Sequence, residues 1–303
     1  MYSMNNIEVF QDTQTRIEKN PLLRLRTEKS KKETKIYHED FFSRKNPSYP
    51  SGRIRLEENT TLQAARNYFG SGKRIGVLNF ANPVEPGGGV LRGASAQEEY
   101  LCRATNLYPC LTGSAASEWY DYHRKLWNST FDGKSFLASD RVIYSPNITV
   151  FRKDDGYRPV ISNTFDQVYT NQWGVVDVIT ASAPYFSCKE CALPEKDLEC
   201  IFRKRIINIL EAAIENNIQI LILGAFGCGA FNNPPSTVAY AFYQVLADFT
   251  NQRYRYAFEE IVFAVMRTKS YCKNIEAFQK CFYEFPFHTV FTPEYIRAHE
   301  DFD

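Results

Sequence analysis

Two adjacent carboxylates, Glu98 and Glu99, follow a run of three glycines, Gly87 to Gly89, after a short spacer. Cleavage of a glycosidic bond needs a carboxylic acid that protonates the leaving oxygen while an oxocarbenium-like ion forms. A carboxyl that is crowded by a like charge and partly buried has a raised pKa, as such an acid requires. Ser95 and Glu98 also have the spacing of a helix capping box, which gives Glu98 a structural alternative that Glu99 lacks. Because adjacent helical residues point about 100° apart, we expect the two carboxylates to have different roles.

Two glycine-rich loops, 79–89 and 224–235, each follow an apolar segment that predicts a buried strand. Without Cβ atoms, the backbone N–H groups of such loops approach an anion closely, and a following helix N-terminus adds to the attraction. A lone pair of glycines is usually only a tight turn, but two such loops after core strands favour a diphosphate site. Neither loop has the lysine-containing motif of nucleotide triphosphatases, which argues against an ATPase or kinase.

Helical and extended segments alternate along most of the chain. Apolar runs predict strands at 74–80, 141–144, 148–151, 175–180, 218–223 and 260–265. Apolar stripes at helical spacing predict helices at 59–69, 198–216, 236–249 and 274–282. The alternation predicts the α/β class, with a mainly parallel sheet sandwiched between helices. Ligands of such sheets bind at the carboxyl ends of the strands, so both glycine loops should lie on that one edge.

Residues 1–58 are polar and basic, and they predict a helical arm followed by a loop. The lysines of this arm are expected to form a solvated helix face rather than a patch for an anionic partner: Lys29, Lys31, Lys32 and Lys35. The formal net charge of +1 excludes a global field for nucleic acid. The start of the chain lacks a signal-peptide pattern, and the apolar runs are shorter than the roughly 20 residues of a bilayer span. We therefore expect an intracellular monomer without membrane contact, in the cytoplasm or alternatively the nucleus.

Eight cysteines are scattered along the chain, and only Cys188 and Cys191 lie close together in sequence. These two could supply half of a zinc site, but no second ligand pair has a suitable spacing and the four histidines are dispersed. Packing or solvent-exposed thiols are the favoured interpretation, so we predict no metal site.

The order of these features resembles one enzyme family. Gly87–Gly89, a seven-residue spacer and Gln97-Glu98-Glu99 are similar to the signature of poly(ADP-ribose) glycohydrolases, which are built on a macrodomain. The surroundings resemble the microbial-type branch, at 77–81, 94–99, 140–146 and 224–231. The resemblance implies a macrodomain-like catalytic domain at 59–290, preceded by a helical extension at 1–58 and followed by a tail at 291–303. It also implies that neither a metal ion nor a redox cofactor takes part.

The resemblance gives each matching residue a role. Glu99 would act as the general acid and then as the base that activates water, while Glu98 would hydrogen-bond the ribose hydroxyls beside the scissile bond. Asn82 would hold the same ribose. The first loop would contact ribose and phosphate through the backbone of Gly87, Gly88 and Gly89. The second loop would wrap the diphosphate through Gly227, Cys228, Gly229 and Ala230. Phe231 would pack on the terminal ribose, Gln97 would contact the ligand, and adenine would lie near Phe80 or the turn 183–185.

The leading prediction is an enzyme that cleaves the ribose–ribose O-glycosidic bond of poly(ADP-ribose) from chain ends and releases ADP-ribose. The alternative is a mono-ADP-ribosyl hydrolase that acts on a protein side chain or nucleic acid, because the same pocket and acid would serve. A third hypothesis is a non-catalytic ADP-ribose-binding module, which the intact pair Glu98 and Glu99 disfavours. Glu85 in the first loop adds an acidic residue beside the expected diphosphate site, and it would weaken the binding of a polyanion.

Overall fold

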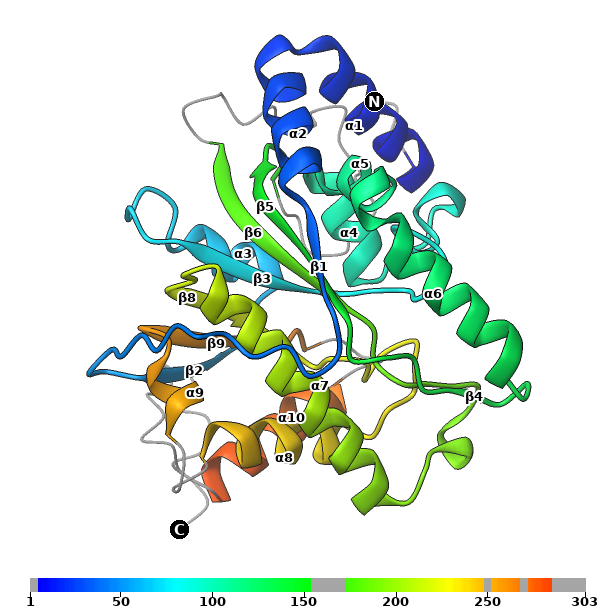
Figure 1. Ribbon diagram of the computed structural model, residues 1–303, viewed down its shortest axis with the longest axis vertical. Helices are drawn as coiled ribbons and strands as arrows, with labels where there is room; N and C mark the ends of the chain where they lie inside the picture. The colour runs from blue at the N-terminus through cyan, green and yellow to red at the C-terminus, as the bar shows by residue number, and fades with distance from the viewer. Residues whose placement is uncertain (1–4, 154–172, 248–251, 268–271, 285–303) are drawn as a thin grey trace.

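The computed structural model describes residues 5–153, 173–247, 252–267 and 272–284, so the predicted tail at 291–303 lies outside the described residues. One mixed seven-stranded sheet has the order β1-β5-β6-β3-β8-β9-β2, with helices on both faces (Figure 1). Its strands are β1 (Lys35–Tyr37), β2 (Arg53–Glu57), β3 (Ile75–Phe80), β5 (Val142–Val150), β6 (Gly174–Ala181), β8 (Ile220–Leu223) and β9 (Glu260–Ala264). A separate two-stranded sheet pairs β4 (Ser135–Phe136) with β7 (Tyr185–Phe186).

The described helices connect these strands or precede them. They are α1 (Asn6–Lys19), α2 (Pro21–Glu33), α3 (Thr61–Arg66), α4 (Gln97–Ala104), α5 (Leu107–Leu111), α6 (Ser114–Thr130), α7 (Glu195–Glu215), α8 (Pro235–Leu246), α9 (Arg253–Tyr256) and α10 (Cys272–Glu284). Two 3₁₀ turns are η1 (Val90–Arg92) and η3 (Lys189–Cys191).

Side chains that alternate along the central strands build two hydrophobic cores, one on each face of the sheet. Leu78 and Ile179 pack with residues of α7, α8 and α10. Their neighbours Val77 and Val178 point to the other face and pack with residues of α3 to α6. Period-two alternation requires this division, because successive side chains of a strand point to opposite faces. The predicted sandwich of a sheet between helices is therefore confirmed.

The sheet is parallel over most of its width. β6, β3, β8, β9 and β2 are neighbours in parallel pairs, while β5 runs antiparallel to both β1 and β6. The mixed, mainly parallel sheet agrees with the predicted class. Because β3 and β8 are adjacent and parallel, the glycine loops that follow them leave the sheet at one edge.

The two short strands predicted at 141–144 and 148–151 are one strand, β5, with a shift in register between Ser145 and Ile148. Pro146 has no N–H for a ladder bond, and Asn147 takes a left-handed φ of 55°. The Asn147 N–H is satisfied elsewhere, because it donates to Oδ1 of the buried Asp177 on β6 at 2.8 Å. Asp177, an acidic residue within the apolar strand β6, thus stabilises the bulge of β5.

The basic N-terminal segment contains the expected helices, α1 and α2, but it also contributes strands that the sequence did not predict. β1 pairs with β5, and β2 pairs with β9 in register from Arg53 to Glu57, so both edge strands of the main sheet come from residues 1–58. α1 packs beside α4, where the Thr13 hydroxyl donates to the Arg103 carbonyl at 2.6 Å. These contacts join residues 1–58 to the same sheet and core as the rest of the chain.

Candidate active site

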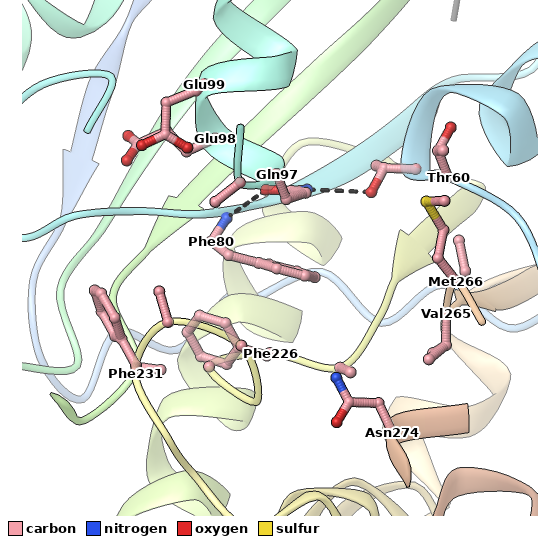
Figure 2. Close-up of a pocket in the computed structure, with 18 of the residues that line it drawn as sticks. Thr60, Phe80, Gln97, Glu98, Glu99, Phe226, Phe231, Val265, Met266 and Asn274 are labelled. Carbon is pink, nitrogen blue, oxygen red and sulfur yellow. Dashed lines mark hydrogen bonds between the residues drawn. The ribbon is translucent and has the colours of Figure 1, made fainter. Parts of the chain in front are cut away.

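A cavity of about 520 Å³ opens where the two glycine loops leave the sheet. Figure 2 shows Glu98 and Glu99 at one end of it and Val265, Met266 and Asn274 at the other. Phe80 at the end of β3 and Phe226 of the second loop lie between these ends, and Phe231 of the same loop lies on the side of the carboxylates. The cavity is therefore elongated, with a carboxylate end and an end, here called the far end, that is lined by both polar and apolar residues.

Glu99 lies on the first turn of α4 and is only 6% exposed. Its Oε1 accepts a hydrogen bond from the Gly89 N–H at 2.7 Å. Its Oε2 is buried and has no hydrogen-bond partner within the described residues. A buried carboxyl oxygen without a partner is costly in a folded protein, and such atoms concentrate where a ligand or water supplies the missing bond.

Glu98 is more deeply held, and only 3% of it is exposed. Its Oε2 accepts the Asn82 N–H at 2.7 Å, and its Oε1 accepts the Asn79 side-chain amide at 3.4 Å. Burial raises the pKa of Glu98 and the charge of Glu99 adds to the shift, while hydrogen bonds from Asn82, Asn79 and the Gly87 N–H partly oppose it, so that the pKa lies at about 8. At neutral pH Glu98 therefore keeps its proton.

The predicted capping box at Ser95 and Glu98 is wrong. α4 begins at Gln97, its N-cap residue is Ala96, and no side chain caps the helix. Glu98 turns inward instead, because the Asn82 N–H and the Asn79 amide offer it partners inside the site. The alternative structural role for Glu98 therefore falls away.

Gln97 lines the cavity, but its amide group is already engaged with the protein (Figure 2). Its Oε1 accepts the Phe80 N–H at 2.9 Å, and its Nε2 donates to the Leu78 carbonyl at 2.7 Å and to the Thr61 hydroxyl at 3.1 Å. Gln97 thus joins the end of β3 to α3 and α4. This geometry favours a positioning role over the predicted ligand contact.

The triple glycine lies against the two carboxylates rather than on the cavity wall: Gly87, Gly88 and Gly89 are absent from the lining residues. Gly88 has a φ of +57°, and a Cβ built on it would lie 2.5 Å from Oε1 of Glu99 and 3.0 Å from Oε2 of Glu98. Only glycine satisfies both the left-handed backbone and this close approach. Glycine is therefore required at position 88 because the loop lies against the acids. The predicted backbone contacts of Gly87, Gly88 and Gly89 to ribose and phosphate stay a prediction.

Asn82 lines the cavity at the start of the first loop, as predicted for a ligand-binding residue. Its Oδ1 accepts the N–H groups of Val84 and Glu85, both at 2.9 Å. The side chain is thereby fixed, and its Nδ2 group is the donor that remains to meet a ligand. The backbone N–H of the same residue holds Glu98, so Asn82 connects the cavity wall to the carboxyl pair.

The second loop supplies four of its five predicted residues to the cavity wall, namely Gly227, Gly229, Ala230 and Phe231. Within the described chain, the N–H groups of Gly229 and Ala230 have no acceptor, so they are available to an anion. Cys228 is different: it is 7% exposed and packs in the core below the loop, where burial raises the pKa of its thiol. The helix that follows, α8, begins at Pro235, one residue before the predicted start, and no side chain caps it.

The far end of the cavity includes residues that sequence reasoning missed. They come from the N-terminus of α3, from the end of β9 and from α10: Asn59, Thr60, Thr61, Val265, Met266 and Asn274. A signal was available for two of them, since Val265 ends the strand predicted at 260–265 and Met266 follows it, at the edge where ligands of parallel sheets bind. Phe80 lines the cavity, and so does Ala183 of the alternative turn, so both predicted adenine positions border it.

No group of three or more histidine, cysteine, aspartate or glutamate residues that could hold a metal ion occurs in the described part of the chain. Cys188 and Cys191 are free, half-buried thiols, and their interaction raises the pKa of Cys188 and lowers the pKa of Cys191. None of the described helices is both long enough and apolar enough to cross a membrane.

Comparisons with known proteins add to this geometry. The family model for the catalytic domain of microbial-type poly(ADP-ribose) glycohydrolase (PARG) matches residues 5–153. No curated protein matches the chain. The structure is similar to crystal structures of poly(ADP-ribose) glycohydrolase from Thermomonospora curvata. The first shares 30% identity with a TM-score of 0.71, over 91% of this chain and 99% of that chain.

The second T. curvata structure, bound to the inhibitor ADP-HPD, shares 29% identity with a TM-score of 0.70, over 91% of this chain and 98% of that chain. The poly(ADP-ribose) glycohydrolase of Deinococcus radiodurans in complex with ADP-ribose shares 26% identity with a TM-score of 0.65. That similarity covers 85% of this chain and 97% of the other.

Proposed function

This chain belongs to the microbial-type poly(ADP-ribose) glycohydrolase family, and on that premise we propose that it hydrolyses the ribose–ribose O-glycosidic bond of poly(ADP-ribose) with Glu99 as the general acid and base. The product is ADP-ribose. The observation that carries the assignment of Glu99 is its pair of carboxyl oxygens: Oε1 is held by the Gly89 N–H, and Oε2 is buried at the end of the cavity without a partner in the described chain.

The residues that line the cavity favour one orientation of a bound ADP-ribose. The diphosphate would accept hydrogen bonds from the N–H groups of Gly229 and Ala230, and Phe231 would pack on the ribose beyond it. Adenine would take the far end, where Phe80 and the residues that follow β9, Val265 and Met266, offer apolar surface. This orientation brings the anomeric carbon of the distal ribose to Glu99.

The reaction then follows from the carboxyl pair. Oε2 of Glu99 gives its proton to the glycosidic oxygen while the bond from that oxygen to the anomeric carbon breaks, and an oxocarbenium-like ribose forms. The next unit of the polymer leaves with a free hydroxyl. The Glu99 carboxylate then takes a proton from water as the water oxygen bonds to the anomeric carbon, which regenerates the acid.

Glu98 contributes to this cycle in two ways. Its carboxyl would hydrogen-bond the ribose hydroxyls beside the scissile bond, and Asn82 would hold the same ribose. Both carboxyls also approach Gly88, where a Cβ would lie 2.5 Å from Oε1 of Glu99 and 3.0 Å from Oε2 of Glu98. Because the raised pKa of about 8 keeps Glu98 protonated at neutral pH, this carboxyl would donate a hydrogen bond to the ribose and would add no negative charge beside Glu99.

The test is to incubate the purified protein with poly(ADP-ribose) and, separately, with a peptide that carries a single ADP-ribose, and to quantify free ADP-ribose by chromatography. We expect release from the polymer. Release from the peptide alone would assign the mono-ADP-ribosyl hydrolase activity instead. Binding of ADP-ribose without release from either substrate would assign a binding module.

A further inference from the structure

We propose that Arg92 binds a phosphate of the polymer unit on the leaving side of the scissile bond, and that it thereby favours poly(ADP-ribose) over a single ADP-ribose group as substrate. This inference rests on the proposed function and adds a subsite outside the cavity. The ligand of the subsite is the diphosphate of a nucleotide unit that the cavity itself does not hold.

The position of Arg92 follows from the first glycine loop. Arg92 ends η1, the short turn that directly follows Gly89. A Cβ built on Gly89 would lie 3.6 Å from Oε1 of Glu99 and 3.7 Å from Nη2 of Arg92. Nη2 of Arg92 therefore lies no more than 7.3 Å from Oε1 of the proposed acid, yet Arg92 does not line the cavity.

The reaction determines which part of the substrate lies on the side of Glu99 that faces away from the cavity. The cavity takes the ADP-ribose whose anomeric carbon reacts, so the group attached through the scissile oxygen must extend from Glu99 away from the cavity. In the polymer this group is another nucleotide unit with its own diphosphate. A single ADP-ribose on an amino-acid side chain has no such second diphosphate, so a cation placed there distinguishes the two substrates.

Without a ligand, the guanidinium group of Arg92 is paired with the carboxylate of Glu85. Nη1 of Arg92 donates to Oε1 of Glu85 at 3.2 Å and Nη2 to Oε2 at 2.6 Å, in a two-pronged ion pair. The side chains of Arg92 and Glu85 remain 68% and 45% exposed, so water screens the pair and it contributes little to stability. Phosphate oxygens present the same geometry to a guanidinium, so a phosphate can take the place of the carboxylate.

The backbone beneath Arg92 is fixed even though its side chain is free to change partners. Val90 is fully buried, and the Gly93 carbonyl accepts the Asn6 side-chain amide of α1 at 2.9 Å. The guanidinium of Arg92 thus extends from a turn, η1, whose backbone is held in place close to Glu99. This arrangement also revises the predicted effect of Glu85: the carboxylate neutralises and orients Arg92 until a polymer phosphate displaces it.

The experiment compares initial rates on poly(ADP-ribose) and on the mono-ADP-ribosylated peptide, for wild type and for Arg92→Gln, Arg92→Lys and Glu85→Gln, over a series of salt concentrations. We expect Arg92→Gln to lower kcat/KM on the polymer about tenfold, to reduce the slope of log(kcat/KM) against log[salt] by about one, and to leave ADP-ribose affinity within about twofold. Arg92→Lys should recover part of the loss. Glu85→Gln should raise kcat/KM on the polymer, because it frees the guanidinium.

Lys73→Gln is the matched control, because Lys73 pairs with Glu259 at the start of β3, at the opposite edge of the sheet from the site. The inference is overturned if Arg92→Gln and Lys73→Gln have the same effect on the polymer, or if Arg92→Gln slows both substrates equally. If wild type cleaves the polymer but Arg92→Gln loses no rate selectively on the polymer, only the proposed subsite is refuted. A wild-type protein that leaves the polymer intact removes the proposed function, and the subsite with it.

Discussion

The backbone N–H of Gly89 and the carboxylate of Glu99 are joined by a hydrogen bond of 2.7 Å. This bond connects the end of the triple glycine to the first turn of α4 across a spacer that contains η1. Because the bond occupies Oε1, the second oxygen has a fixed direction. The glycines and the glutamates therefore act as one unit, in which the loop sets the geometry of the acid.

Replacing Gly88 with alanine is expected to lower kcat by at least about 10²-fold. The new Cβ would meet both carboxyl groups at a backbone φ that alanine rarely adopts, so the acids would have to move. The measurement is the steady-state rate of ADP-ribose release, together with the melting temperature. Gly72→Ala is the control, because Gly72 also has a positive φ, +74°, but nothing within 4 Å of its Cβ position. Equal effects of the two changes on kcat would show that backbone strain alone is responsible.

Replacing Gln97 with alanine is expected to lower the free energy of unfolding by about 2–4 kcal/mol. The change leaves the Phe80 N–H, the Leu78 carbonyl and the Thr61 hydroxyl without the partner that Gln97 supplies. Urea denaturation measures the loss, and Gln11→Ala at an exposed position of α1 is the control. If Gln97→Ala weakened ADP-ribose binding while the unfolding curve stayed in place, the residue would be a ligand contact after all.

Glu98 predicts a specific dependence of stability on pH. Its folded pKa of about 8 lies above the ordinary value of 4.5, so between these pH values the folded protein binds a proton that the unfolded chain does not. Stability should therefore fall as pH rises through this window, with the full loss present above about pH 8. The glutamine of Glu98→Gln has no titratable proton. The free energy of unfolding of this variant, relative to wild type, should therefore increase with pH by up to roughly 5 kcal/mol.

The measurement for this prediction is urea denaturation of both proteins at several pH values from 4.5 to 8.5. Glu118→Gln on the exposed face of α6 is the control, with a side chain that is 64% exposed. A constant difference between wild type and Glu98→Gln across the range would mean that Glu98 is charged in the folded protein at neutral pH.

The sequence predicted the central strands and the shared edge of the two loops because these depend on apolar runs that are visible along the chain. It missed β1 and β2, although Ile54 and Leu56 alternate with charged residues in β2 as a half-buried strand requires. The proline and glycine turn signals at 46–52 directly before β2 masked this short pattern. Edge strands are short and gain their stability from a neighbour that is distant in sequence, here β9.

The carboxyl pair could be located from sequence, but its surroundings could not. The spacing of Ser95 and Glu98 predicts a local cap, whereas Glu98 in fact bonds to Asn79 near the end of β3 and to Asn82 on the loop that follows. Likewise, the ion pair of Glu85 with Arg92 depends on how the glycine loop folds back, which no local pattern records. Tertiary contacts decide both cases.

The central claim is that the carboxyl of Glu99 transfers the proton in the reaction. The most direct test is a single-turnover assay of ADP-ribose release from poly(ADP-ribose) by Glu99→Gln, with calorimetric binding of ADP-ribose to the same protein. Glutamine keeps the shape of the side chain but cannot transfer the proton, so we expect a rate loss of about 10²- to 10⁴-fold with binding retained. A wild-type rate of release in Glu99→Gln would contradict the account.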